Sequence, residues 1–242
     1  MIRQLIDPAN AVTATGLVLS AIGINFSVAG LPEIGVAIVL WALLADHLDG
    51  VVARRTRGRL AETGQVGKNL DSLADLVSAG IFPAITLTTV GRGSAISVAA
   101  GTVLIVASVL RLSYFNVFGS PGGRFIGVPT TYVVPATAVL FLLRPVIPEA
   151  IFPNLFALVL VGLAILHIVP LRVPKTAGVM YVVVTAFCVG ASIVLATRCH
   201  EELPVRLSAA QRGDSLLHGG ETFERLRPVE SDRPPLRLFP FT

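Results

Sequence analysis

Charged residues are scarce in this chain. Only 14% of its 242 residues are Asp, Glu, Lys or Arg, whereas 53% are hydrophobic and the mean hydropathy is +0.77. Soluble domains usually contain about 25% charged residues. The composition therefore excludes an ordinary soluble domain and predicts an integral membrane protein.

Cysteine is also scarce, and only Cys188 and Cys199 are present. On one continuous helix their axial separation would be about 16 Å, which is too long for a disulfide between them. The chain has no cluster of cysteine and histidine, and this disfavours a zinc site.

Long apolar runs are abundant, and each ends at a polar or Gly/Pro-rich break. Runs of about 20 residues can cross a bilayer, and a backbone in lipid must satisfy its own hydrogen bonds, so these runs are helices. The expected spans are 10–30, 34–54, 67–90, 95–117, 127–143, 152–170 and 177–197. We therefore predict an all-α, polytopic membrane helix bundle with six core transmembrane helices and a seventh, and no cleavable signal peptide.

Two regions of different composition are expected. Residues 1–199 form the membrane-embedded domain, and residues 200–242 form a polar tail. The tail is rich in Pro, Arg and Glu and has little apolar periodicity, so we predict that it is disordered. A nonessential extension is favoured over a partner-binding or lipid-binding arm.

Basic residues predict the orientation of the bundle. The second, fourth and sixth loops hold Arg54, Arg55, Arg57, Arg59, Lys68, Arg124, Arg172 and Lys175, whereas the first, third and fifth hold Arg92 and Arg144. By the positive-inside rule, the N-terminus and the even-numbered loops are cytoplasmic. The basic loop RRTRGR beside a membrane favours anionic headgroups over nucleic acid as its partner.

Four aspartates interrupt this apolar sequence. Asp46 and Asp49 end the second expected span, and Asp71 and Asp75 begin the third. Each pair lies on one helix face, because its spacing is three or four residues. The two faces, joined by a short basic loop, can present four carboxylates to one point at the cytoplasmic end.

Carboxylate ligands without cysteine or histidine favour a hard cation, Mg²⁺ or Mn²⁺. The small residues Gly50, Ala53 and Gly67 leave room for a bulky ligand between the helices, and Arg54 can bind a phosphate. Two other interpretations are open. The aspartates could form interhelical polar contacts, or they could line the ion path of a transporter or channel, although that function favours polar residues throughout the membrane depth.

The spacing resembles the motif of the CDP-alcohol phosphatidyltransferases. It reads Asp46-x2-Asp49-Gly50-x2-Ala53-Arg54, followed by Gly67-x3-Asp71-x3-Asp75. The resemblance implies that these aspartates bind two metal ions, Mg²⁺ or Mn²⁺, and that Asp75 is also the general base. It further implies CDP-diacylglycerol as a substrate, phosphatidyl transfer with release of CMP, and a homodimer.

Other segments resemble the branch of this family that uses serine. Arg111 and Asn116 lie in RLSYFN, and Phe125, Gly127 and Pro129 lie in FIGVPTTYVVPA. This resemblance implies that Arg111 and Asn116 bind substrate and that L-serine is the acceptor.

The family also often has Asn and Thr at the start of the first helix against the nucleotide, as Asn10 and Thr13 would be here. Asn10 could instead cap that helix. His167 is a candidate acid–base group, but a hydrogen-bonded polar residue at a helix interface is the favoured interpretation.

The expected enzyme is therefore a CDP-diacylglycerol–serine O-phosphatidyltransferase of the cell membrane, with its site facing the cytoplasm. Within the same chemistry, inositol phosphate, glycerol phosphate or another alcohol are alternative acceptors. A phosphorylated acceptor would require several cations, which Arg111, Arg124, Arg172 and Lys175 could supply.

Overall fold

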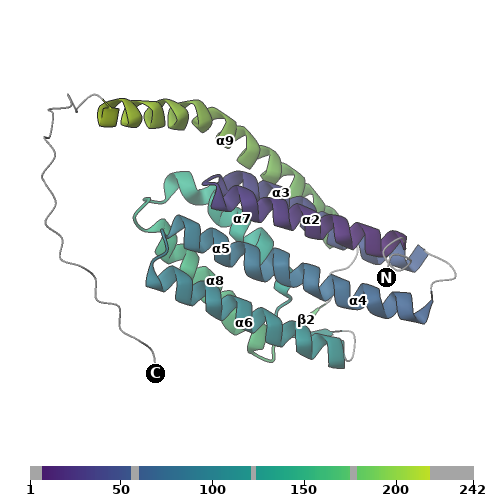
Figure 1. Cartoon of the computed structure of the whole chain (residues 1–242). Coiled ribbons are helices and arrows are strands. Elements are labelled where there is room, and N and C mark those ends of the chain that lie inside the picture. Colours follow the sequence, from purple (N-terminus) through teal and green to yellow (C-terminus); the bar gives the residue numbers. More distant parts are fainter. Residues whose placement is uncertain (1–6, 56–59, 121–123, 175–178, 219–242) are drawn as a thin grey trace, which may run out of the picture. The chain divides into compact units, whose positions relative to one another are not determined.

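The structure is a computed structural model that describes residues 7–55, 60–120, 124–174 and 179–218. Within these ranges, the side chains of 49–51, 53–55, 124, 174 and 200–218 are not described. The chain divides into two units, Met1–Glu201 and Glu202–Thr242. The first unit is a bundle of helices (Figure 1). The all-α prediction is confirmed for the described residues, apart from one short ribbon.

The α-helices follow one another with short connections. They are α2 (Pro8–Val28), α3 (Pro32–Arg55), α4 (Ala61–Asp75), α5 (Phe82–Val90), α6 (Ala95–Phe118), α7 (Val133–Leu143), α8 (Phe152–Ile168) and α9 (Val179–His218). A π-helix, η1 (Leu76–Ile81), joins α4 to α5. Two 3₁₀ turns, η3 (Thr130–Tyr132) and η4 (Arg144–Val146), flank α7.

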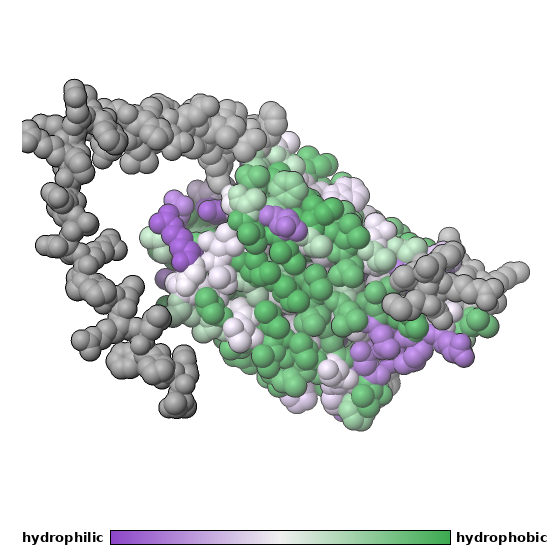
Figure 2. Space-filling model, in the orientation of Figure 1, coloured by the Kyte–Doolittle hydropathy of each residue, from purple (hydrophilic) through white to green (hydrophobic). Residues whose placement is uncertain are grey.

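Several helices are long and apolar enough to cross a membrane. In the described residues these are Pro8–Val28, Ala61–Val90, Ala95–Phe118 and Val179–Cys199, with shorter apolar segments at Thr130–Val146 and Phe152–Ile168. Large apolar side chains are exposed on their outer faces, among them Val117, Leu158 and Val182. Apolar residues cover most of the face in Figure 2. An exterior of this kind indicates an integral membrane protein; the exact set of six core spans and a seventh remains a prediction.

Some expected boundaries were wrong. The third expected span begins at Ala61 rather than 67, because α4 continues into the segment that we expected to be a polar loop. The fifth begins later than 127, because Gly127 turns the chain with φ +76° and helical structure starts only at Thr130. The residues before this turn, Arg124–Ile126, form strand β1. β1 pairs antiparallel with β2 (Arg172–Pro174), with Phe125 opposite Val173. The helix of the seventh expected span, α9, continues to His218, but its apolar part, Val179–Cys199, agrees with the expected 177–197. The domain boundary expected at residue 199 stays a prediction; residues 219–242 lie outside the described residues, and their disorder also remains a prediction.

The helices α2 and α3 lie unusually close together at two glycines. A Cβ built on Gly35 would lie 2.5 Å from Ser27 Oγ and 2.6 Å from the Gly23 carbonyl oxygen. Only glycine permits this approach, because no neighbouring backbone atom can yield easily. Ser27 Oγ also lies 3.0 Å from Thr86 Oγ1, which connects α2 to α5. The close approach of Gly23 and Gly35 fixes the position of α3 against α2, and α3 is the helix that carries Asp46.

The π-helix η1 follows directly after Asp75. The N–H of Phe82 donates to the Val77 carbonyl, which is the wider π-type spacing. Pro83 is the physical reason, because its ring lacks an N–H and would collide with the carbonyl four residues earlier in an α-helix. The wider turn shifts the face that α4 presents relative to that of α5. It is therefore part of what orients Asp75.

The close helix contact makes a stability prediction. Gly35→Ala should lower the free energy of unfolding by about 1–3 kcal/mol, because the new methyl group overpacks against the Gly23 backbone. Thermal unfolding in detergent measures this change. Gly162→Ala in α8 is the matched control, since a Cβ there has no heavy atom within 4 Å. Equal melting temperatures of the two variants would contradict the packing argument.

Candidate functional site

Two of the four aspartates line one small cavity. Asp46 of α3 and Asp75 of α4 lie on its wall, together with Thr13 of α2 and Ser78 of η1. The cavity holds about 10 Å³, and its other lining residues are Gly16, Ser20, Ala42 and Ala74. Small side chains and hydroxyls thus surround the two carboxylates. Asp71 lies one turn before Asp75 on α4 and is half-buried.

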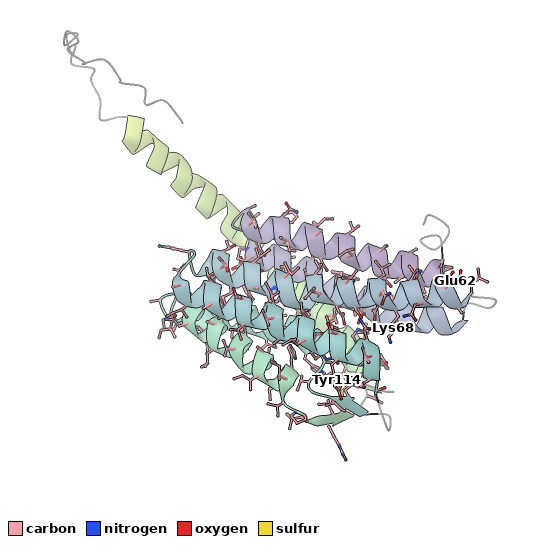
Figure 3. All side chains as sticks on the ribbon, turned by 60° about the horizontal axis from the view of Figure 1, so that its bottom comes forward. Glu62, Lys68 and Tyr114 are labelled. Carbon is pink, nitrogen blue, oxygen red and sulfur yellow. The ribbon has the colours of Figure 1, made fainter. Side chains whose placement is uncertain are left out.

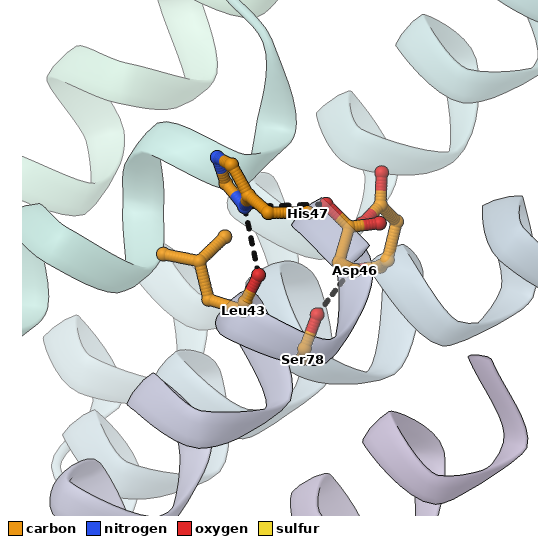
Figure 4. A network of polar contacts seen from close by, with 5 residues as sticks. Leu43, Asp46, His47 and Ser78 are labelled. Carbon is orange, nitrogen blue, oxygen red and sulfur yellow. Dashed lines mark hydrogen bonds and ion pairs between the residues drawn. The ribbon is translucent and has the colours of Figure 1, made fainter. Parts of the chain in front are cut away.

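Local hydrogen bonds position the residues around Asp46. His47 Nδ1 lies 2.8 Å from the Leu43 carbonyl oxygen and 3.9 Å from Asp46 Oδ2. Ser78 Oγ donates to the Asp75 carbonyl oxygen at 3.4 Å. Figure 4 shows Asp46 and His47 beside Ser78. Asp46, Asp75 and Ser78 thus come from three elements to line the same cavity.

The start of α2 closes the same region. Asn10 is buried and its Nδ2 donates to the Thr63 carbonyl oxygen of α4 at 3.5 Å. The helix cap is Asp7, whose carboxylate accepts from the Asn10 backbone N–H at 3.3 Å, so the interpretation of Asn10 as the cap was wrong. Thr13 Oγ1 donates to the Ala9 carbonyl oxygen at 3.1 Å and also lines the cavity.

Arg111 of α6 lies buried next to this site. Its guanidinium carbon lies 5.2 Å from the centre of the Phe115 ring and 5.8 Å from that of Phe125. The Asp75 carboxylate is close enough to act on it electrostatically. Its Nε is buried without a hydrogen-bond partner among the described residues. Arg111 does not reach out to the membrane surface, as an exposed arginine would.

The segment after α6, around Gly127 and Val128, contacts the end of α8 near Arg111. His167 Nδ1 of α8 lies 3.0 Å from the Val128 carbonyl oxygen, and the Val128 N–H donates to the Leu166 carbonyl at 3.0 Å. Gly127 has φ +76°, and a Cβ there would collide with the His167 carbonyl oxygen. Glycine is therefore required for this loop to lie against the end of α8.

Asn116 lies at a second cavity rather than at that of Asp46 and Asp75. Its Oδ1 accepts from Ser72 Oγ at 3.0 Å, and its backbone carbonyl accepts from Lys68 Nζ at 2.6 Å. This cavity, of about 300 Å³, lies between α4 and α6 and is lined by Asn69, Ser72, Leu73, Leu76, Val109, Leu112, Ser113 and Asn116. Figure 3 shows Lys68 and Tyr114 toward the end of the bundle at which Glu62, in the first turn of α4, lies.

The remaining candidates have side chains outside the described part. Asp49, Gly50, Ala53 and Arg54 lie on α3, as expected, but their side chains are not described. Gly67 is buried on α4. Among the described side chains, no group of three or more His, Cys, Asp or Glu residues is close enough to hold a metal ion. The expected four-carboxylate arrangement thus remains a prediction.

Sequence reasoning missed Thr130. The favoured interpretation of His167, a hydrogen-bonded residue at a helix interface, agrees with its hydrogen bond to Val128. Their neighbourhood depends on the β1–β2 ribbon and on the turn at Gly127, which bring the loops after α6 and α8 together. No spacing in the sequence signals this pairing, because strands of three residues carry almost no periodicity.

Comparison with known proteins identifies the family. The sequence model of the family described as CDP-alcohol phosphatidyltransferase matches residues 7–189, which is most of the chain. The match includes every sequence-predicted site residue described above.

Individual relatives carry names that refer to serine. The chain is 38% identical to an archaetidylserine synthase of Methanothermobacter thermautotrophicus over 49% of this chain and 48% of the relative. It is 33% identical to a CDP-diacylglycerol–serine O-phosphatidyltransferase of Helicobacter pylori over 55% of each. A protein of the same name in Methanocaldococcus jannaschii is 26% identical over 80% of this chain and 86% of the relative. The matches thus span about half the length of the first two relatives.

Proposed function

The chain belongs to the CDP-alcohol phosphatidyltransferase family, and from this premise we propose that it transfers the phosphatidyl group of CDP-diacylglycerol to L-serine. The products are phosphatidylserine and CMP. The observation that carries this proposal is the pairing of two carboxylates, Asp46 and Asp75, on one cavity, with the buried Arg111 guanidinium of α6 acting on Asp75. The serine-specific names of the relatives support the acceptor.

The cavity residues fit a divalent metal ion in their donor chemistry. Asp46 and Asp75 offer carboxylate oxygens, and Thr13, Ser20 and Ser78 surround them with hydroxyls, a set that suits Mg²⁺ or Mn²⁺. Asp46, Asp49, Asp71 and Asp75 would hold two such ions. When bound, the ions neutralise charge on the diphosphate and on the departing CMP.

Residues of the chain would accept the proton of the serine hydroxyl and orient the two substrates. In the proposed reaction the serine hydroxyl oxygen attacks the phosphorus that carries diacylglycerol, and the bond from that phosphorus to the CMP oxygen breaks. Asp75 takes the hydroxyl proton, because it lies at the cavity beside the acceptor arginine. The nucleotide side of the site is assigned to Asn10, Thr13, Gly50, Ala53, Arg54 and Gly67. Asn116 supports the contact between α4 and α6 by accepting a hydrogen bond from Ser72.

Arg111 is the residue that favours serine as the acceptor. A guanidinium binds a carboxylate through two parallel hydrogen bonds, and Arg111 has a buried Nε that still lacks a partner. Its positive charge also attracts the Asp75 carboxylate. An acceptor with a carboxylate next to its hydroxyl would therefore meet both groups at once.

The proposed setting is the cell membrane, with the site at the cytoplasmic face, and the active form is a homodimer. The acyl chains of CDP-diacylglycerol remain in lipid between the apolar helix faces, while the nucleotide and serine arrive from water. The end of α3 and the residues that follow it carry Arg54, Arg55, Arg57 and Arg59, which supports the cytoplasmic side.

The first test concerns the metal. Purified protein in detergent should lose activity in EDTA and regain it with Mg²⁺ or Mn²⁺, and Asp46→Asn should lower kcat at least a hundredfold without changing the melting temperature. Glu149→Gln, an exposed carboxylate after η4, is the control and should leave kcat unchanged. Full turnover in EDTA would exclude metal dependence.

The second test separates proton transfer from binding. Asp75→Asn should remove the chemical step while the affinity for CDP-diacylglycerol stays within about tenfold of the wild type, or about 1.4 kcal/mol. Single-turnover kinetics and titration with the nucleotide measure the two quantities. If binding fails while single-turnover chemistry persists, then Asp75 acts mainly as a ligand and the base lies elsewhere.

The third test concerns the acceptor. Arg111→Lys keeps the charge but loses the two-bond geometry, so the KM for L-serine should rise about tenfold or more while the KM for CDP-diacylglycerol changes little. Labelled L-serine, inositol phosphate and glycerol phosphate are compared in the wild type. Product from a phosphorylated polyol but not from serine would refute the serine assignment and leave phosphatidyl transfer in place.

A further inference from the structure

Three buried side chains around the segment 125–130 have polar atoms without a hydrogen-bond partner among the described residues. These atoms are Arg111 Nε, His167 Nε2 and Thr130 Oγ1. Their residues are 8%, 3% and 0% exposed, respectively. Buried polar atoms in native proteins are nearly always paired, so three unpaired ones in one neighbourhood require an explanation.

One segment of chain connects all three. The Phe125 ring lies against the Arg111 guanidinium, the Val128 carbonyl faces His167 Nδ1, and Thr130 begins η3 two residues later. Arg111 is close enough to act electrostatically on both Asp75 and His167. The unpaired atoms therefore come from α6, α8 and η3 and lie around one short stretch next to the proposed base.

The hydrogen bond to Val128 determines what His167 can offer. A carbonyl oxygen only accepts, so His167 Nδ1 must carry the proton. In the neutral ring, Nε2 then presents a lone pair and accepts a hydrogen bond. Thr130 Oγ1 can accept as well. The neighbourhood thus combines one cationic donor with two acceptors.

This combination matches an α-amino acid in its zwitterionic form. We propose that Arg111, His167 and Thr130 form the acceptor pocket, in which Arg111 binds the carboxylate while His167 Nε2 and Thr130 Oγ1 accept from the ammonium group. The inference rests on the proposed function, because Asp75 must then face the hydroxyl of the same molecule. It extends that function by assigning ammonium recognition to two residues on η3 and α8.

Three-point recognition has a stereochemical consequence. The carboxylate, the ammonium and the hydroxymethyl group are attached to one carbon, and each meets a different side chain. The enantiomer can satisfy two of these contacts but not the third. The pocket should therefore prefer L-serine to D-serine, and this preference should depend on His167.

His167→Asn separates recognition from structural support. The asparagine amide can still donate to the Val128 carbonyl from the place of Nδ1, but it has no group at the place of Nε2. Full-length protein in detergent, with CDP-diacylglycerol and Mg²⁺ or Mn²⁺, is assayed with L-serine, D-serine and 3-hydroxypropionate, which lacks the ammonium. The variant should lose roughly tenfold to a hundredfold in kcat/KM for L-serine but less than about threefold for 3-hydroxypropionate.

Thr130 provides an independent variant with a matched control. Thr130→Val should narrow the selectivity for L-serine over 3-hydroxypropionate, because it removes an acceptor for the ammonium. Thr137→Val is the control, since Thr137 is equally buried and its hydroxyl is also unpaired, but it lies about 10 Å further along the chain on α7. The KM for CDP-diacylglycerol and the melting temperature report the integrity of each variant.

The outcomes separate this inference from the proposed function. If the wild type makes no phosphatidylserine, the serine assignment fails and the pocket fails with it. If the wild type uses L-serine but both His167→Asn and Thr130→Val keep its selectivity over 3-hydroxypropionate and D-serine, the pocket is refuted and the proposed function stands. A loss of selectivity in both variants, with Thr137→Val unchanged, supports the pocket.

Discussion

The buried guanidinium of Arg111 is the constraint on which the rest of the site depends. A charge away from water is tolerated only with compensating partners, and Arg111 has two aromatic rings and the Asp75 carboxylate nearby. This requirement favours a position of α6 beside η1, where Gly80 contacts Ser108. It also draws Phe125 over the guanidinium, and so places the loop that reaches His167. A single charge thereby organises side chains from four elements.

The π-helix between α4 and α5 lets one continuous helical segment serve both the polar cavity and the hydrophobic core. In an uninterrupted α-helix, the helix face that carries Asp71 and Asp75 would continue unchanged into the apolar α5. The wider turn at Leu76–Ile81 changes this phase, so that Asp75 and Ser78 line the cavity while Phe82 enters the hydrophobic core. Irregular turns of this type recur at functional sites, because they place polar groups where a regular helix would not. In this protein Pro83 causes the wider turn, and the turn places Asp75 and Ser78 at the cavity.

Periodicity and charge in the sequence were sufficient to predict the helices and the acidic residues. Asp46, Asp71 and Asp75 are recognisable because charges inside apolar runs are rare, and their spacing assigns them to helix faces. The same logic cannot find η1, because Pro83 permits either a kink or a wider turn. It also cannot find the β1–β2 ribbon or the unpaired atom of His167, which arise from contacts between loops far apart in the chain. Asn10 shows a related limit, since Asp7 competes for the same capping role and precedes a proline that starts the helix.

The charge balance around Arg111 bears on the choice between serine and a phosphorylated acceptor. One guanidinium already faces the Asp75 carboxylate, so an acceptor that adds a single carboxylate and a compensating ammonium leaves the local charge unchanged. A phosphate would bring up to two negative charges beside Asp75 and would need further cations within hydrogen-bond reach. Of the other basic candidates, Arg172 is exposed on β2, and the side chains of Arg124 and Lys175 lie outside the described residues. The proposed pocket, which pairs one buried arginine with two neutral acceptors, is therefore electrostatically suited to a zwitterion, and this property, rather than the aspartates, would select the acceptor.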